Sequence, residues 1–314
     1  MSFLFYLVLI IALALVILWF RRRHLFTDIR DEFAAAWDDA KAEVHAHRAA
    51  ADTGEPIGDE EAGEIIDWYR RQARPALILR PDPTADASTA AARLGGDVWF
   101  ADGEKWPVGA DGAKLEFVAQ YDLARLPPLD GFPSQGVARF FVGRNDIWGV
   151  DFDAPDRSNV RVLWHDGPQS GGRLEPPLPW GEDENSPFES VSARADGVAL
   201  RPEPVDDLPD FDSWQLQERL EREAGRPGLD AVENALFDVC ETRGFAHRIG
   251  GHPSFTQPDF RRPGVHDDLD VLLLGLSSDE TIMWGDVGEA GFYIRRADFD
   301  RRDFTRVGFY WDCH

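Results

Sequence analysis

The chain has 314 residues, and its 57 Asp and Glu residues outnumber its 33 Lys and Arg residues, giving a formal net charge of −24 at pH 7. A surface with this excess of negative charge repels the phosphates of DNA and RNA, so no nucleic acid is expected as a partner. Two cysteines are too few for a disulfide framework and favour a reducing compartment. The acidic charge suits a basic protein partner or a cation, and it also serves simply to keep a protein soluble.

An apolar run at the N-terminus predicts a membrane anchor. Residues 3–20 contain no charged side chain, and Arg21, Arg22 and Arg23 follow at once. As a helix at about 1.5 Å per residue, the run extends roughly 27 Å, close to the ~30 Å hydrocarbon core of a bilayer. Because the arginines follow the run, the pattern fits a span better than a cleaved signal peptide. We expect residues 1–23 to anchor the protein in the bacterial inner membrane, with the N-terminus outside and the body in the cytoplasm.

Residues 24–73 are predicted as a helical stalk. Ile29, Phe33 and Trp37 recur at a spacing of four and form one apolar stripe on a helix over residues 28–50. Two alternatives stay open for this stripe: it forms a homodimer, or it packs back on the body. A second helix is predicted at Asp59–Arg71.

The body, residues 74–314, is expected to be an α+β fold with mainly antiparallel strands. A helical hairpin within residues 214–243 is predicted from two apolar-periodic runs, Leu216–Ala224 and Leu229–Thr242. The segments Leu174–Pro187 and Pro202–Asp212 are rich in proline and acid, and are predicted as loops. Short apolar runs bounded by Gly, Pro and Asp predict strands at Leu115–Tyr121, Val137–Val142, Val160–Trp164, Leu269–Leu274 and Gly291–Arg295.

An internal repeat indicates that the body is duplicated, with similar lobes at about 90–200 and 245–314. A glycine pair at a turn, a buried strand and a second strand recur in this order. Two related half-sheets would leave a cleft between them, which is a natural ligand site. The matching segments, displaced by 154 or 155 residues, are Arg93–Gly96 with Arg248–Gly251, the strand from Leu115 with the strand from Leu269, and Gly136–Phe141 with Gly291–Arg295.

A series of short motifs between about residue 90 and residue 314 is specific in its order and spacing. The motifs are Arg93-Leu-Gly-Gly96, Trp106-Pro107, Leu115–Leu123, Gly136–Phe141, His247–Pro253 with Gln257, Leu272–Leu274, Ser278-Asp279, Trp284–Gly288, Phe292–Ile294, Asp298-Phe299, Phe304 and Asp312-Cys313. In these motifs the chain resembles the YwqG-like family, a bacterial domain of unknown function.

The resemblance implies an α+β fold with an apparent duplication, and it brings no established activity or cofactor. Some relatives look associated with toxin–immunity gene neighbourhoods, which favours a binding role. The chain departs from the family's pattern at two places. Asp97–Asp102 stands where the family has a proline-rich stretch, and Gly275 stands where a glutamine is typical.

Six residues are candidates for a ligand site in the cleft between the lobes. Polar amides and carboxylates beside large aromatic rings are typical of small-molecule pockets. The same side chains can instead hydrogen-bond turn backbones or close a core, and the aspartate of the loop Trp284–Gly288 suits a turn. The candidate cleft residues are Trp106, Gln120, Asp122, Gln257, Trp284 and Asp286.

The sequence contains no recognisable catalytic signature, phosphate-binding loop or dinucleotide fingerprint. His247, His252, Cys313 and His314 match no metal-binding spacing, so neither a metal nor a cofactor is expected. Cys240 lies on an apolar helix face and is predicted to be a core residue. We therefore expect a membrane-tethered binding protein of immunity or regulatory type that captures a protein partner. The rival hypotheses are a small-ligand sensor or enzyme using the cleft, and a structural scaffold.

Overall fold

The computed structural model describes residues 54–167, 171–177, 185–241 and 244–314. The predicted anchor at 3–20 and the helix predicted at 28–50 lie outside these residues. Within the described ranges, no helix combines the length and the hydropathy needed to cross a membrane. The chain separates into two compact units, and the larger one contains Asp59–Arg222 and Val232–His314.

The smaller unit contains, of the described residues, 54–58 and Glu223–Ala231. Backbone hydrogen bonds join its two segments: the Gly54 nitrogen donates to the Gly225 oxygen at 3.1 Å, and the Ile57 nitrogen donates to the Pro227 oxygen at 2.8 Å. The Arg226 Nε also donates to the Glu55 oxygen at 2.9 Å.

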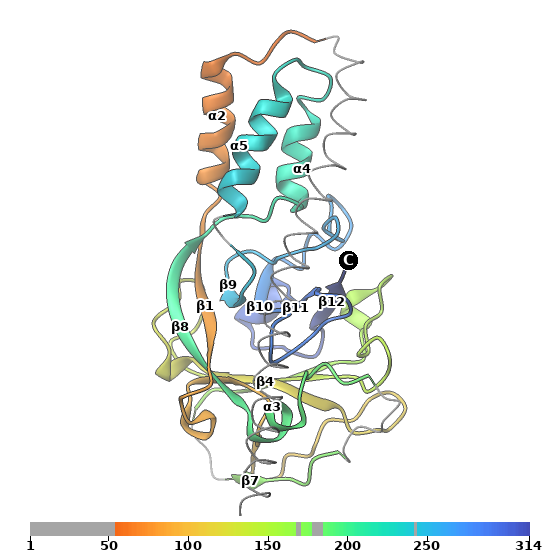
Figure 1. Ribbon diagram of the computed structural model, residues 1–314. Coiled ribbons are helices and arrows are strands. Elements are labelled where there is room, and N and C mark those ends of the chain that lie inside the picture. Colours follow the sequence, from red (N-terminus) through yellow and green to blue (C-terminus); the bar gives the residue numbers. More distant parts are fainter. Residues whose placement is uncertain (1–53, 168–170, 178–184, 242–243) are drawn as a thin grey trace, which may run out of the picture. The chain divides into compact units, whose positions relative to one another are not determined.

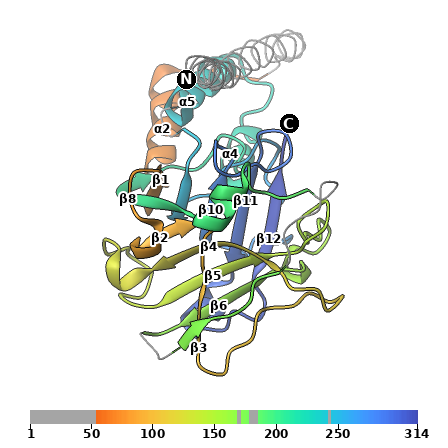
Figure 2. The ribbon, with the colours of Figure 1, turned by 60° about the horizontal axis from the view of Figure 1, so that its bottom comes forward.

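The larger unit is built on one ten-stranded sheet with the strand order β12-β11-β10-β9-β1-β8-β2-β4-β5-β6 (Figures 1 and 2). All neighbouring strands in it are antiparallel, which confirms the mainly antiparallel body. A separate two-stranded ribbon pairs β3 with β7. The strands are β1 Arg74–Asp82, β2 Ala92–Leu94, β3 Trp99–Ala101, β4 Glu116–Asp122, β5 Val137–Val142, β6 Arg161–His165, β7 Gly171–Arg173, β8 Val198–Asp207, β9 His247–Gly250, β10 Val271–Ser277, β11 Glu289–Ile294 and β12 Gly308–Asp312.

The strand order is the same on both sides of the central β1–β8 pair. From β1 the sheet continues through β9, β10, β11 and β12, and from β8 it continues through β2, β4, β5 and β6. Each side carries one β-bulge at a matching place, between Phe117 and Ala119 on β4 and between Leu272 and Leu274 on β10, which lie 155 residues apart. A bulge bends its strand and increases the local twist, so both halves of the sheet curve at this point.

The register corrects one of the three repeat matches. Gln120 pairs with Arg139, and Gly275, which follows Gln120 by 155 residues, pairs with Gly291. The structural counterpart of Gly291 is therefore Arg139 rather than Gly136. The reason is loop length, because the connection from β10 to β11 is three residues shorter than the connection from β4 to β5.

The main core lies between the two curved halves of the sheet. Phe140 on β5 and its structural counterpart Phe292 on β11 meet with their ring centroids 5.0 Å apart. Nearby, Trp148 packs on Trp284 at 5.1 Å and on Trp311 at 4.7 Å. In Figure 2, strands β4 to β6 run across strands β10 to β12, consistent with a sheet that curls back on itself.

Three of the helices in the larger unit follow the predicted pattern. The helix α2 (Asp59–Arg70) begins with three acidic residues, which suit the positive end of the helix dipole. The predicted hairpin consists of α4 (Trp214–Glu221) and α5 (Leu229–Glu241), of which the residues from Val232 on belong to this unit. The short helices α3 (Val191–Asp196) and α6 (Arg296–Asp300), and the 3₁₀ turns η1 (Ala87–Thr89), η2 (Leu123–Arg125) and η3 (Pro155–Arg157), were not predicted.

Although α2 was assigned to the stalk, it packs within the larger unit. Its Ile65 and Tyr69 are fully buried, and the Tyr69 hydroxyl donates to the Pro209 oxygen at 2.7 Å. The last helix of residues 24–73 is thus part of the unit that contains the sheet.

The loop predicted at Pro202–Asp212 is wrong, because its first half is the second half of β8. Pro202 pairs with Leu79 and Pro204 pairs with Leu77 of β1. The neighbour on the other side, β2, pairs only with Val198 and Ala199. Beyond these, β8 has a strand neighbour on one side only within the described residues. Two prolines spaced two apart are tolerated there, because their nitrogens face the side that needs no ladder hydrogen bond.

Candidate functional site

The first-half candidates are Trp106, Gln120 and Asp122. Trp106 is buried, and its Nε1 donates to the Leu115 oxygen at 2.8 Å. Gln120 on β4 accepts a hydrogen bond from the Arg93 Nη2 at 3.3 Å through its side-chain oxygen. Asp122 ends β4 and caps the turn η2, because its carboxylate accepts from the Ala124 nitrogen at 3.1 Å.

The second-half candidates lie in other surroundings. Trp284 is fully buried in the main core. Gln257 is exposed, and its Nε2 donates to the Cys313 oxygen at 2.6 Å. Asp286 is exposed in the β10–β11 loop, where its backbone oxygen accepts from the His314 nitrogen at 3.3 Å. The described contacts of the six candidates therefore tie them to the fold rather than to one common opening.

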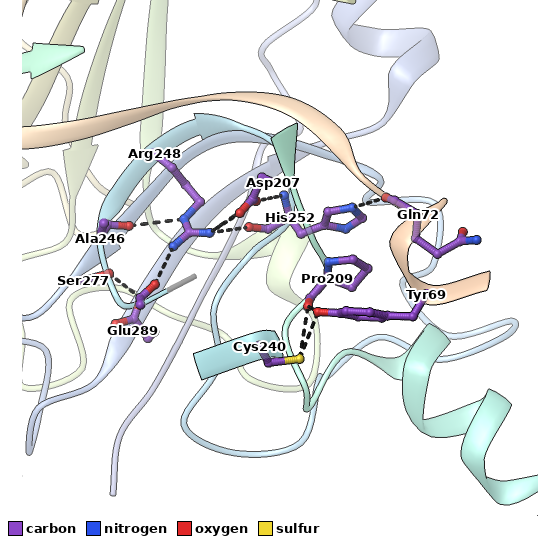
Figure 3. Close-up of polar contacts among 11 residues, drawn as sticks. Tyr69, Gln72, Asp207, Pro209, Cys240, Ala246, Arg248, His252, Ser277 and Glu289 are labelled. Atoms are coloured by element: carbon purple, nitrogen blue, oxygen red, sulfur yellow. Dashed lines mark hydrogen bonds and ion pairs between the residues drawn. The ribbon is translucent and has the colours of Figure 1, made fainter. Parts of the chain in front are cut away.

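The two repeat arginines lead to the most charged part of the interior. Arg248 on β9 is 1 % exposed, and its Nη1 donates to both carboxylate oxygens of Asp207 at 3.0 and 3.2 Å (Figure 3). The same nitrogen lies 3.4 Å from the His252 oxygen, and the Nε donates to the Ala246 oxygen at 3.2 Å. A buried guanidinium thus meets a buried carboxylate from the end of β8.

Two further buried carboxyl groups stand near this ion pair. Glu289 on β11 accepts from the Ser277 hydroxyl at 2.7 Å, and its burial raises its pKa to about 8 (Figure 3). Asp312 on β12 is opposite Glu289 in register, and burial raises its pKa to about 6 although Thr256 donates to it. Such shifted groups are typical of functional sites, and they also occur in structural ion-pair networks.

The histidines of the predicted motif are held by the fold. The His247 Nδ1 accepts from the Ser277 nitrogen at 3.1 Å, and its Nε2 lies 3.0 Å from a carboxylate oxygen of Asp279. Burial acts to raise the pKa of Asp279, but the hydrogen bond from His247 outweighs it and lowers that pKa. His252 bonds to the Gln72 backbone oxygen at 2.8 Å (Figure 3).

The prediction of Cys240 as a core residue needs a correction. Cys240 is only half-buried, and its sulfur lies 2.9 Å from the Tyr69 hydroxyl (Figure 3). The helix α5 presents this edge to a polar partner on α2 rather than to an apolar core.

An exposed surface that the sequence did not reveal combines aromatic and acidic side chains. Phe152 is 46 % exposed, and its ring centroid lies 5.6 Å from that of Tyr310 and 5.8 Å from that of Trp311. The Trp311 Nε1 donates to the Ile147 oxygen at 3.1 Å. We define the acidic–aromatic patch as Asp146, Ile147, Asp151, Phe152, Asp153, Tyr310 and Trp311.

The comparison with protein families places this architecture. A family model described as a domain of unknown function (DUF1963) matches residues 92–313. Because the match covers most of the chain, the protein belongs to this family. It includes β2 to β12 and leaves out α2 and β1. A comparison with curated proteins finds no match.

Proposed function

We propose that this protein is a membrane-tethered binding protein of YwqG-like type, which captures a basic protein partner in the cytoplasm as an immunity or regulatory protein. The observation that carries the proposal is the acidic–aromatic patch. In it three exposed carboxylates, Asp146, Asp151 and Asp153, surround exposed or half-buried rings. The candidate cleft residues, in contrast, make hydrogen bonds and packing contacts within the fold.

The chemistry of the patch suits lysine and arginine side chains. The face of an aromatic ring attracts a cation, and a nearby carboxylate adds a Coulombic attraction. Phe152 stands directly between Asp151 and Asp153 in the chain, and both acids are exposed. With a net charge of −24, the whole chain also steers a basic partner toward it. These features favour a basic partner over an acidic one.

The tether contributes by position. The apolar run at 3–20 with its three arginines is the sequence basis for membrane attachment. A binding domain fixed to a membrane has a raised effective concentration toward anything that reaches that surface. Such a protein would intercept a partner that acts at the membrane.

Phe152→Ala is expected to reduce the recovery of the partner about tenfold, because exposed aromatic anchors dominate binding energy. The melting temperature should change by less than about 2 °C, because a surface substitution away from the core costs little. A photoreactive amino acid at position 152 of the full-length protein in native membranes should crosslink one partner. Its recovery should also fall in Asp151→Asn and at high salt, because screening weakens charge attraction.

Position 245 supplies the matched control. Phe245 is an exposed aromatic residue just before β9, and β9 lies three strands from β12 in the sheet. Crosslinks of equal yield from positions 152 and 245, or no stoichiometric partner from position 152, would contradict the proposal. An acidic partner recovered at position 152 would contradict its charge argument.

A further inference from the structure

Three polar residues lie side by side on neighbouring strands of the first half of the sheet. Arg93 on β2 is opposite Gln120 on β4, and Gln120 is opposite Arg139 on β5. Residues opposite each other in register project from the same face of a sheet. We call these three residues the Arg–Gln–Arg row. Both arginines are buried, at 7 % and 0 % exposure.

The Arg139 end of the row is neutralised by the fold. Its guanidinium donates to both carboxylate oxygens of Glu104 at 2.8 and 3.0 Å and to the Trp99 oxygen at 2.8 Å. The His165 Nε2 lies 2.6 Å from the same carboxylate. Burial acts to raise the pKa of Glu104, but the hydrogen bonds from Arg139 and His165 bring that pKa down to about 2. Glu104 is thus an ionised partner for Arg139.

The Arg93 end has only neutral acceptors among the described residues. Its Nη2 donates to the Asp97 backbone oxygen at 2.5 Å and to the Gln120 side-chain oxygen at 3.3 Å. Burial lowers the pKa of Arg93, and Coulombic repulsion from Arg173 and Arg125 acts in the same direction, while the attraction of Asp97 opposes them. A buried cation without a carboxylate partner is costly, so this position is unusual in a folded protein.

Unused hydrogen-bond donors mark the same row. The Nε atoms of Arg93 and Arg139 are both buried without a hydrogen-bond partner in the described part of the chain. Buried polar groups are nearly always paired in native proteins, and exceptions call for an explanation such as a bound group. The unpaired atoms here are donors carried by cations, so the missing group is an acceptor, and an anion fits best.

The second half of the sheet provides an internal comparison. Arg248 follows Arg93 by 155 residues, and its Nη1 reaches the His252 oxygen just as Arg93 reaches the Asp97 oxygen, four residues further along in each case. At this equivalent position the fold supplies the carboxylate of Asp207. The residue opposite Arg248 is Gly275, whereas Gln120 stands opposite Arg93. One arginine of the pair is neutralised internally, and the other keeps its charge beside an amide.

We infer that the Arg–Gln–Arg row is a binding site for a small oxyanion, a phosphate or carboxylate group held by Arg93 with Gln120 beside it. A guanidinium donates two parallel hydrogen bonds to such a group, and the Gln120 amide adds a neutral donor. The bound anion supplies the charge that Asp207 supplies to Arg248. This site is independent of the acidic–aromatic patch, and it lies on one half of the sheet rather than in a cleft between lobes.

The test is a thermal shift assay on the full-length protein in detergent with sodium phosphate and, separately, sodium succinate. Either salt at 10 mM is compared with chloride at equal ionic strength. A ligand present at about ten times its Kd should raise the melting temperature by roughly 3 °C. A shift with phosphate alone assigns a phosphate site, a shift with succinate alone assigns a carboxylate site, and both together assign a general oxyanion site.

Variants of the row decide whether a shift comes from this site. Arg93→Met should abolish the shift, and Arg93→Lys, which keeps the charge but lacks the Nε donor, should weaken apparent affinity at least fivefold. Arg80→Met, which removes an exposed arginine paired with Glu203 on the central strands, should leave the shift intact. The inference is overturned if neither salt shifts the wild type at up to 50 mM, or if the shift persists in both Arg93 variants.

Discussion

Arg248→Met is expected to lower the melting temperature by roughly 10 °C, because it leaves the buried carboxylate of Asp207 without its guanidinium. Removing one partner of a buried ion pair costs about 3–5 kcal/mol, and in a domain of this size each kcal/mol lowers the melting temperature by about 2–4 °C. Asp207 is 3 % exposed, so water cannot replace the lost partner without rearrangement. Thermal unfolding followed by circular dichroism measures the change.

The matched control is Arg93→Met at the equivalent position of the first half. Arg93 has no carboxylate hydrogen bond among the described residues, so its loss leaves no buried anion behind. Without ligand, we expect this variant to melt within about 3 °C of the wild type or above it. Equal destabilisation by the two substitutions would show that both arginines act mainly through packing, and would remove the basis for treating them differently.

The combined variant Arg248→Met with Asp207→Leu sharpens the argument. Replacing both members of a buried ion pair by apolar residues of similar volume is often neutral or stabilising. The double variant should therefore recover at least half of the stability lost in Arg248→Met. No recovery would indicate that the other partners of this pair, such as the His252 and Ala246 oxygens, carry its contribution.

Elements with a strong local pattern could be predicted from the sequence. The strand Val137–Val142 has the predicted bounds, and α2 differs from its prediction by one residue, because each is an apolar pattern closed by clear end signals. The second half of β8 could not be predicted, since its two prolines argue against a strand unless the missing neighbour is known.

Register and side-chain partners were beyond the sequence for a different reason. The repeat correctly paired Arg93 with Arg248 in position, but it carried no information on which carboxylate would meet either residue. Asp207 lies 41 residues before Arg248 in the chain and reaches it only because β8 and β9 flank β1 on either side. Likewise, the patch joins Phe152 to Tyr310 and Trp311 across about half of the chain, which no local motif can indicate.

Acidification is expected to stabilise the protein between pH 8 and pH 6.5 through Glu289. Its pKa is about 8 in the folded protein and near the ordinary value of 4.5 when unfolded, so the folded state binds the extra proton in this range. The contribution is fully present below pH 4.5 and is lost as the pH rises through 8, with a slope of about 1.4 kcal/mol per pH unit. Denaturant unfolding at a series of pH values measures this slope.

Glu289→Gln tests the origin of that slope, since the amide stays neutral and still offers an oxygen to the Ser277 hydroxyl. The variant should match the wild type near pH 5, exceed its melting temperature by roughly 5 °C at pH 8, and show no slope from pH 6.5 to 8. Asp312, whose pKa is raised to about 6, titrates below this window, and Glu104, whose pKa is lowered, titrates further below it. Arg248 favours the ionised form of Glu289, whereas Asp312 and Asp210 oppose it. A wild type with no slope in the window would mean that Arg248 prevails and Glu289 is ionised, so that one guanidinium serves two buried carboxylates.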